Sequence, residues 1–131
     1  MAKDSYSVLI LARFNFQLPD KKQYAQWQEQ YPNLLIAGMT VHASKGQEAE
    51  QVIVLGMEAG QFGFPSEKSV FPLTQLLQPS RETYAHAEER RLFYVALTRA
   101  KQAVYLCCHR DKPSSFITEL TTQDYSIIID E

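Results

Sequence analysis

The stretch TRAK, residues 98–101, separates two apolar segments of the chain. The segment before it, 87–97, reads AEERRLFYVAL, with its charges in the first turn and apolar residues in the second half. The segment after it, 103–107, reads AVYLC. This pattern predicts a helix, a tight turn and a strand, with Arg99 at the corner. A guanidinium keeps its charge at neutral pH and offers five donors in a planar fork, so an arginine held at such a corner suits contact with phosphate oxygens.

The composition is that of an ordinary globular domain. The chain has 131 residues, of which 45% are hydrophobic and 21% are charged. This indicates a single domain over residues 1–131 that buries a core of its own. The formal net charge of −2 argues against a broad basic surface for nucleic acid, although it leaves room for a small local site.

Cysteine usage and hydropathy indicate a cytoplasmic protein. Cys107 and Cys108 are adjacent, whereas a disulfide framework or a zinc site needs more cysteines at other spacings, so we expect reduced thiols. No apolar run approaches the roughly 18 residues of a membrane span, and the first residues lack the apolar core of a signal peptide. We therefore expect no membrane partner.

Apolar runs alternate with helical patterns along the chain. This alternation predicts an α/β fold with a mostly parallel sheet flanked by helices. Aromatic residues at positions 24, 27 and 31 share one helical face, which we expect to pack in the core. The strands are expected at 7–12, 34–39, 51–56, 103–108 and 125–131, and helices before Pro32 and at 70–78, 81–97 and 113–120.

A second polar segment, TVHASKGQE, occupies residues 40–48. Thr40 and His42 alternate, so in an extended segment both donors lie on one side and reach one phosphate of a single strand. Lys45 and Gly46 are expected to begin a short helix, whose free N–H groups favour anions. Glu48 would then point from that helix toward the ligand that the loop cradles.

These segments resemble motifs of superfamily 1 helicases of the UvrD/Rep type. EERRLFYVALTRAK, at 88–101, resembles motif VI, and residues 40–48 resemble motif V, whose usual form is Thr-x-His-x-x-Lys-Gly-x-Glu. The corner at Arg13, after the strand 7–12, looks like motif IV. The resemblance runs from about residue 8 to residue 107 and implies a C-terminal, RecA-like helicase domain. The residues beside Glu48 depart from the common motif V and look closest to the helicase IV branch.

The resemblance also implies roles for individual residues. Arg13 and Arg99 would be a pair of catalytic arginine fingers that reach the γ-phosphate of ATP. Gly46 and Glu48 would complete the ATP-binding set, with the carboxylate at the ribose. The single-stranded DNA backbone would be contacted by Thr40, His42 and Lys45.

The chain lacks the phosphate-binding motif Gly-x-x-x-x-Gly-Lys-Ser/Thr. The end of the chain, 127–131, imitates a Walker B strand with its Asp-Glu pair, but it has no P-loop partner and we reject it. The resemblance implies a 3′-to-5′ DNA helicase as the parent, with single-stranded DNA as substrate. Its N-terminal RecA-like domain would be the partner that binds most of the ATP and the Mg²⁺, and this chain would bind no metal.

Three functions are therefore compared. The favoured one is the second motor domain of a DNA helicase, which alone should not hydrolyse ATP. The alternative is a stand-alone, non-catalytic module that binds nucleic acid or a protein. A third, an α/β domain that binds a small molecule at its strand ends, requires both long motifs to be accidental.

Overall fold

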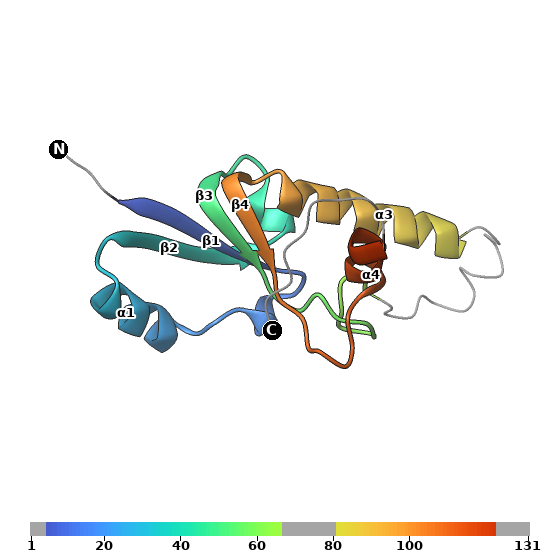
Figure 1. Cartoon of the computed structure of the whole chain (residues 1–131), viewed down its shortest axis with the longest axis horizontal. Helices are drawn as coiled ribbons and strands as arrows, with labels where there is room; N and C mark the ends of the chain where they lie inside the picture. The colour runs from blue at the N-terminus through green and yellow to red at the C-terminus, as the bar shows by residue number, and fades with distance from the viewer. Residues whose placement is uncertain (1–4, 67–80, 123–131) are drawn as a thin grey trace.

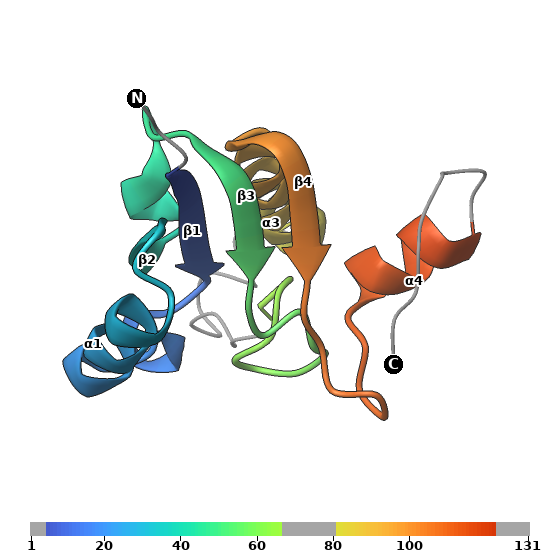
Figure 2. The same cartoon turned by 60° about the vertical axis from the view of Figure 1, so that its left-hand side comes forward.

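The computed structural model describes residues 5–66 and 81–122, and its centre is a four-stranded sheet (Figures 1 and 2). All pairings are parallel and the strand order is β2-β1-β3-β4. This confirms the predicted mostly parallel α/β fold of the RecA-like type. The strands are β1 (Tyr6–Ala12), β2 (Leu34–Thr40), β3 (Ala49–Val54) and β4 (Ala100–Leu106).

Two strands, β3 and β4, begin two and three residues earlier than the sequence pattern predicts. β3 begins at Ala49, whose amide donates to the carbonyl of Arg99 (3.0 Å), and Ala49 pairs with Ala100 at the start of β4. The first residues of these strands include polar ones, which interrupt the apolar pattern that predicts a strand. Their side chains lie on a partly open face of the sheet. Gln51 and Gln102 hydrogen-bond to each other there (2.9 Å).

The helices follow local capping signals. Asp20 accepts a hydrogen bond from the amide of Gln23 (2.9 Å) and caps α1 (Lys21–Gln30). The helix α3 spans Arg81–Leu97 as predicted, and α4 spans Ser115–Thr122. Two short 3₁₀ helices, η1 (Asn15–Gln17) and η2 (His42–Ser44), complete the described elements.

The start of α4 differs from the prediction. The hydroxyl of Ser114 accepts from the amide of Ile117 (3.2 Å), so this buried serine caps the helix. Pro113 therefore lies before the helix, where it pairs with Glu58 in an isolated bridge. The helix predicted at 70–78 and the strand predicted at 125–131 lie outside the described residues.

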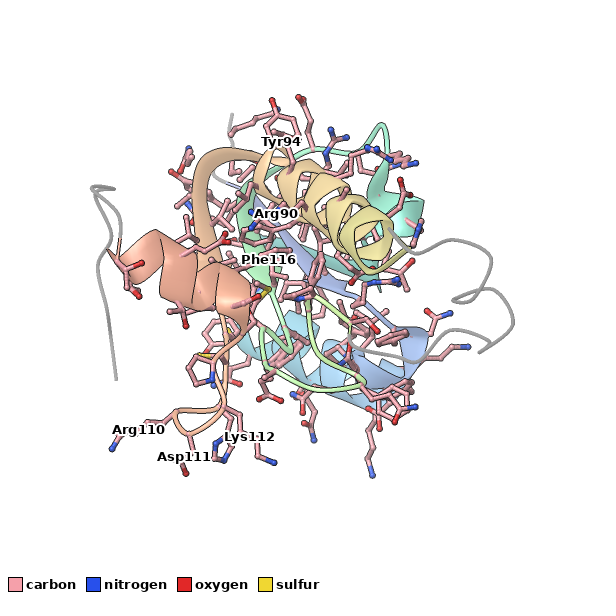
Figure 3. All side chains as sticks on the ribbon, turned by 90° about the vertical axis from the view of Figure 1, so that its right-hand side faces the viewer. Arg90, Tyr94, Arg110, Asp111, Lys112 and Phe116 are labelled. Carbon is pink, nitrogen blue, oxygen red and sulfur yellow. The ribbon has the colours of Figure 1, made fainter. Side chains whose placement is uncertain are left out.

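One face of the sheet carries the hydrophobic core; α3 lies across this face in Figure 2, and α4 adds Phe116 to the core from beyond β4. Phe93 of α3 stacks on Phe116 of α4 with ring centres 4.8 Å apart, and Phe64 meets both rings edge-on. In Figure 3 Arg90 lies toward Phe116, and its guanidinium stands 5.3 Å from the centre of that ring. The sheet contributes Leu9, Leu11, Val52 and Val54 to this core.

The other face carries α1 beside β2. The Tyr24 ring lies against Gly38, where a Cβ would stand 1.7 Å from the phenol oxygen, and Trp27 meets that ring edge-on. Tyr24 and Trp27 are only half-buried and Tyr31 is exposed, so the prediction that this stripe packs in the core is wrong for Tyr31. None of the helices within 5–66 and 81–122 is long and apolar enough to cross a membrane.

Candidate functional site

Arg99 stands at the corner between α3 and β4, as the sequence predicts. Its Nε donates to the carbonyl of Val95 in the last turn of the helix (3.1 Å). The outer nitrogens make longer contacts, from Nη1 to the carbonyls of Ser44 (3.5 Å) and Gln47 (3.4 Å), and from Nη2 to the hydroxyl of Thr98 (3.3 Å). The guanidinium is therefore anchored at its base, while the fork itself is weakly engaged.

The segment that the fork faces is a tight turn at residues 44–47. Gln47 donates its amide to the carbonyl of Ser44 (2.9 Å), Lys45 has φ −59° and ψ 127°, and Gly46 has φ +86°. These angles define a type II turn, which requires a positive φ at its third residue and so favours glycine there. The prediction that Lys45 and Gly46 begin a helix is wrong, because η2 ends at Ser44.

Thr40 and His42 do not alternate along an extended segment. Between them Val41 has helical backbone angles, is fully buried, and donates its amide to the carbonyl of Ala12 (3.0 Å). The chain therefore bends directly after β2, and the hydroxyl of Thr40 accepts from the amide of Ala43 (3.3 Å). His42 is exposed on the bend, so the two polar side chains remain accessible from a different geometry than predicted.

The segment 40–48 crosses from one edge of the sheet to the other. Thr40 is paired with Ala12 at the carboxyl ends of β2 and β1, whereas Ala49 is paired with Ala100 at the amino ends of β3 and β4. β3 alone has six residues, so these edges are about 20 Å apart. In Figure 2 the arrowheads mark the carboxyl edge.

Arg13 and Arg99 lie at these opposite edges. Arg13 directly follows β1 at the carboxyl edge, where its guanidinium pairs with Glu89 of α3. Arg99 directly precedes β4 at the amino edge. The structure therefore does not bring together the two arginines for which the sequence predicts contact with one phosphate.

Glu48 lies exposed in the connection just before β3. It borders a hollow of about 320 Å³ on the sheet, where Leu35 is also exposed. Nearby, the Ser7 hydroxyl donates to Glu50 and lowers the pKa of that carboxyl group, with smaller contributions from backbone amides and Lys101. The amino edge thus gathers Arg99, Lys45, Gly46 and Glu48 around one turn.

Glu89 is a buried residue of the site region that the sequence reasoning did not single out. Its side chain is 8% exposed, and it contacts Arg13 and the amide of Ser66. A signal for it exists, because Glu89 shares the helical spacing of the buried residues Leu92 and Ala96. Glu88, the preceding residue, pairs instead with Arg91 on the surface.

The fold, the two motif segments and the corner arginine together define a class of protein. A family model described as the UvrD-like helicase C-terminal domain matches residues 17–111. The chain belongs to this family, which confirms the resemblance drawn from motifs V and VI.

Individual relatives are DNA helicases by name. The chain is 40% identical over 126 residues to DNA helicase IV of Escherichia coli K12, covering 96% of the chain and 18% of that protein. It is 36% identical over 93 residues to a probable DNA helicase II homolog of Mycoplasma genitalium, covering 66% and 12%. It is 43% identical over 68 residues to the ATP-dependent DNA helicase PcrA of Bacillus subtilis, covering 52% and 8%. The chain thus spans less than a fifth of each of these relatives.

Proposed function

We propose that this chain is the second motor domain of an ATP-dependent DNA helicase that moves 3′ to 5′. The observation that carries the proposal is the course of segment 40–48. It begins beside the carboxyl ends of β1 and β2 and ends in the turn that faces the Arg99 fork. A single segment that reaches both edges suits a motor domain, because it can couple the affinity for DNA to the bound state of the nucleotide.

In this proposal Arg99 is the arginine finger. The N-terminal RecA-like domain of the longer helicase holds ATP and Mg²⁺, and the amino edge of this sheet faces the γ-phosphate. Arg99 exchanges its long contacts with backbone carbonyls for charge-assisted bonds to phosphate oxygens, which are stronger. Gly46 keeps the turn open to the nucleotide, and the exposed Glu48 carboxylate accepts from a ribose hydroxyl.

The DNA contacts are assigned to the start of the same segment. Thr40 and His42 offer donors at the bend after β2, and Lys45 adds a charge farther along the segment, on the exposed turn at the amino edge. Such groups suit phosphate oxygens of a single strand, which they hold without reading sequence. The net charge of −2 fits a small local contact better than a wide basic surface.

Arg13 receives a different assignment from the one that its sequence context predicted. Its guanidinium is engaged by Glu89 and lies at the edge opposite to Arg99. We therefore assign it to anchoring α3, and leave Arg99 as the finger that this domain supplies.

ATP hydrolysis by this chain, with and without single-stranded DNA, tests whether the nucleotide site depends on the N-terminal RecA-like domain. We expect no turnover from the chain alone, because it carries no phosphate-binding loop, and DNA-stimulated turnover from the full-length helicase. Phosphate release measured on both proteins at equal concentration decides the matter. Turnover by the chain alone would refute the proposal, because it would require a complete nucleotide site within these 131 residues.

The salt dependence of DNA binding tests the contacts that are assigned to DNA. In the full-length helicase, Lys45→Ala is expected to reduce the slope of log K against log salt by about 0.7, the value for one phosphate contact on a single strand. Thr40→Ala combined with His42→Ala should weaken binding at every salt concentration, because it removes two hydrogen-bond donors to phosphate oxygens. Fluorescence anisotropy with an oligothymidylate measures both.

Thr40→Ser is the matched control for the DNA contact. It keeps the hydroxyl that also accepts from the amide of Ala43, so the bend after β2 is preserved. Binding by Thr40→Ser should stay within about twofold of the unmodified protein. If Lys45→Ala leaves the slope unchanged, the contact assigned to this turn is wrong.

A further inference from the structure

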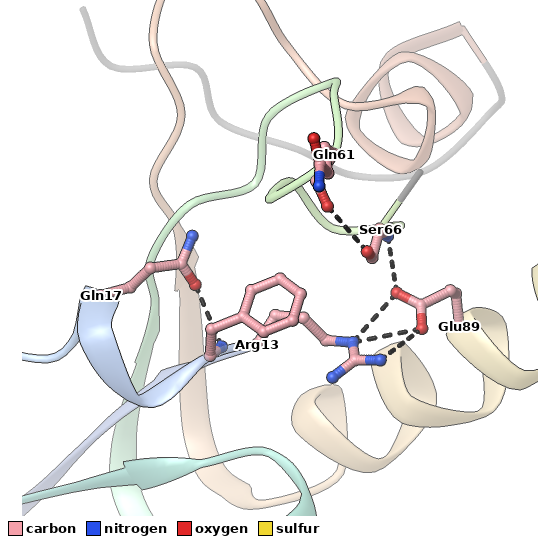
Figure 4. A network of polar contacts seen from close by, with 6 residues as sticks. Arg13, Gln17, Gln61, Ser66 and Glu89 are labelled. Atoms are coloured by element: carbon pink, nitrogen blue, oxygen red, sulfur yellow. Dashed lines mark hydrogen bonds and ion pairs between the residues drawn. The ribbon is translucent and has the colours of Figure 1, made fainter. Parts of the chain in front are cut away.

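An ion pair between the buried Glu89 and the half-buried Arg13 joins the carboxyl edge of the sheet to the middle of α3 (Figure 4). Arg13 donates from Nε to both carboxylate oxygens of Glu89 (3.1 and 3.2 Å) and from Nη2 to Oε2 (2.9 Å). The amide of Ser66 donates to Oε1 (2.6 Å), and the Ser66 hydroxyl donates to the carbonyl of Gln61 (2.9 Å). One carboxylate therefore ties together β1, α3 and the loop that follows β3.

This pair differs from the other ion pairs of α3. The side chains of Arg91 and Glu88 are 69% and 46% exposed, whereas those of Arg13 and Glu89 are 19% and 8% exposed. A buried carboxylate is tolerated only where donors satisfy its oxygens, and such a pair is poor evidence for added stability. The pair instead fixes the position of α3 relative to β1, because its bidentate contact permits little displacement between them.

The position of Glu89 along α3 links this geometry to Arg99. From Glu89 to the last helical residue, Leu97, the helix rises about 12 Å without interruption. Arg99 follows within the next turn of chain, with its Nε bonded to that same helix. A displacement of α3 at Glu89 is therefore carried to the guanidinium of Arg99.

The same strand end also anchors the segment assigned to DNA. The carbonyl of Ala12 accepts from the amide of Val41 (3.0 Å), and Arg13 is the next residue of the chain. Thr40, directly before Val41, is the last residue of β2. The backbone at Ala12 thus contacts the DNA-side bend, and the side chain of the next residue, Arg13, contacts α3.

We propose that Glu89 is a positioning residue that couples the DNA side of this domain to the arginine finger. Its bond to Arg13 links it to the strand end that supports the bend at Val41. Its place on α3 links it to the position of Arg99. The inference rests on the proposed function, since it takes Arg99 to act on the nucleotide. It assigns Glu89 no contact with substrate.

The test compares ATP hydrolysis by the full-length helicase with and without single-stranded DNA. Glu89→Gln is expected to lower the DNA-stimulated kcat by about 10- to 100-fold, the range that a displacement of a catalytic group by up to about 1 Å produces. The KM for ATP and the Kd for an oligothymidylate should stay within about twofold, and the basal rate should fall far less than the stimulated rate. The diagnostic quantity is the ratio of stimulated to basal rate, which a merely structural role would leave unchanged.

Two further variants complete the test. Glu88→Gln, on the adjacent exposed position, should keep the full stimulation ratio. Arg13→Gln combined with Glu89→Gln removes both charges, so it leaves no unpaired charge should Glu89→Gln fold poorly, and it should show the same reduced ratio. A normal ratio in either Glu89 variant would overturn the inference. If Arg99→Ala also retains normal turnover, the proposed function fails; if Arg99→Ala is inactive, only the coupling role fails.

Discussion

Replacement of Arg99 by alanine is expected to lower DNA-stimulated ATP turnover of the full-length helicase by about 10³- to 10⁵-fold, the range that an arginine finger contributes to phosphoryl transfer. The physical reason is the loss of a fork that is already anchored through Nε at the end of α3. Affinity for single-stranded DNA should change little, because Thr40 and His42 lie at the opposite edge of the sheet and Lys45 keeps its charge. Steady-state kcat at saturating DNA and an anisotropy titration measure the two quantities.

Two variants show whether the planar guanidinium fork or the positive charge of Arg99 is responsible for the rate of ATP turnover. Arg99→Lys keeps a positive charge but loses the planar pair of donors, so it should recover only a small part of the rate. Arg91→Ala removes an exposed arginine from the same helix, and its turnover should stay within about twofold of the unmodified protein. If the turnover of Arg99→Ala is within tenfold of that of the unmodified protein, the proposal that Arg99 is the arginine finger is wrong.

The features that the sequence predicts well are those with local causes. The end of α3 at Leu97 follows from its apolar spacing, and the buried strand at Tyr6–Ala12 follows from a continuous apolar run. The turn that carries Arg99 follows from the change of period between α3 and β4. None of these requires knowledge of a partner that is distant in the chain.

The geometry of segment 40–48 depends on distant contacts, and here the local pattern misled. Alternating polar residues indicated an extended stretch, yet Val41 is buried and its amide bonds to Ala12 on a neighbouring strand. Glu89 gives a similar lesson. Its spacing relative to Leu92 indicates a buried position, but its partner Arg13 is 76 residues away and cannot be read from the helix itself.

The separation of Arg13 from Arg99 could have been derived from the sequence together with the sheet type. A residue that follows a strand lies at the carboxyl edge, and a residue that precedes a strand lies at the amino edge. In a parallel sheet these edges are opposite, whichever order the strands take. The prediction of a parallel sheet thus already argued against a shared phosphate for these two arginines within one domain.

Replacement of Phe64 by alanine is expected to destabilise the chain by about 3–5 kcal/mol, the usual cost of removing a buried phenylalanine ring. Phe64 is fully buried and meets Phe93 of α3 and Phe116 of α4 edge-on, with ring centres 5.8 and 6.0 Å away. It therefore holds together both helices on the core face, and its loss leaves a cavity beneath them. Urea unfolding monitored by circular dichroism gives the difference.

Phe62→Ala is the matched control, because Phe62 is in the same loop but is 48% exposed. It loses only surface ring contacts with Phe14 and Phe16, so its cost should be about 1 kcal/mol or less. Equal destabilisation by the two variants would mean that the loop as a whole, rather than the buried ring, supports α3 and α4. Because Ser66 of this loop also bonds to Glu89, Phe64→Ala should in addition loosen the contact that places α3, and with it Arg99.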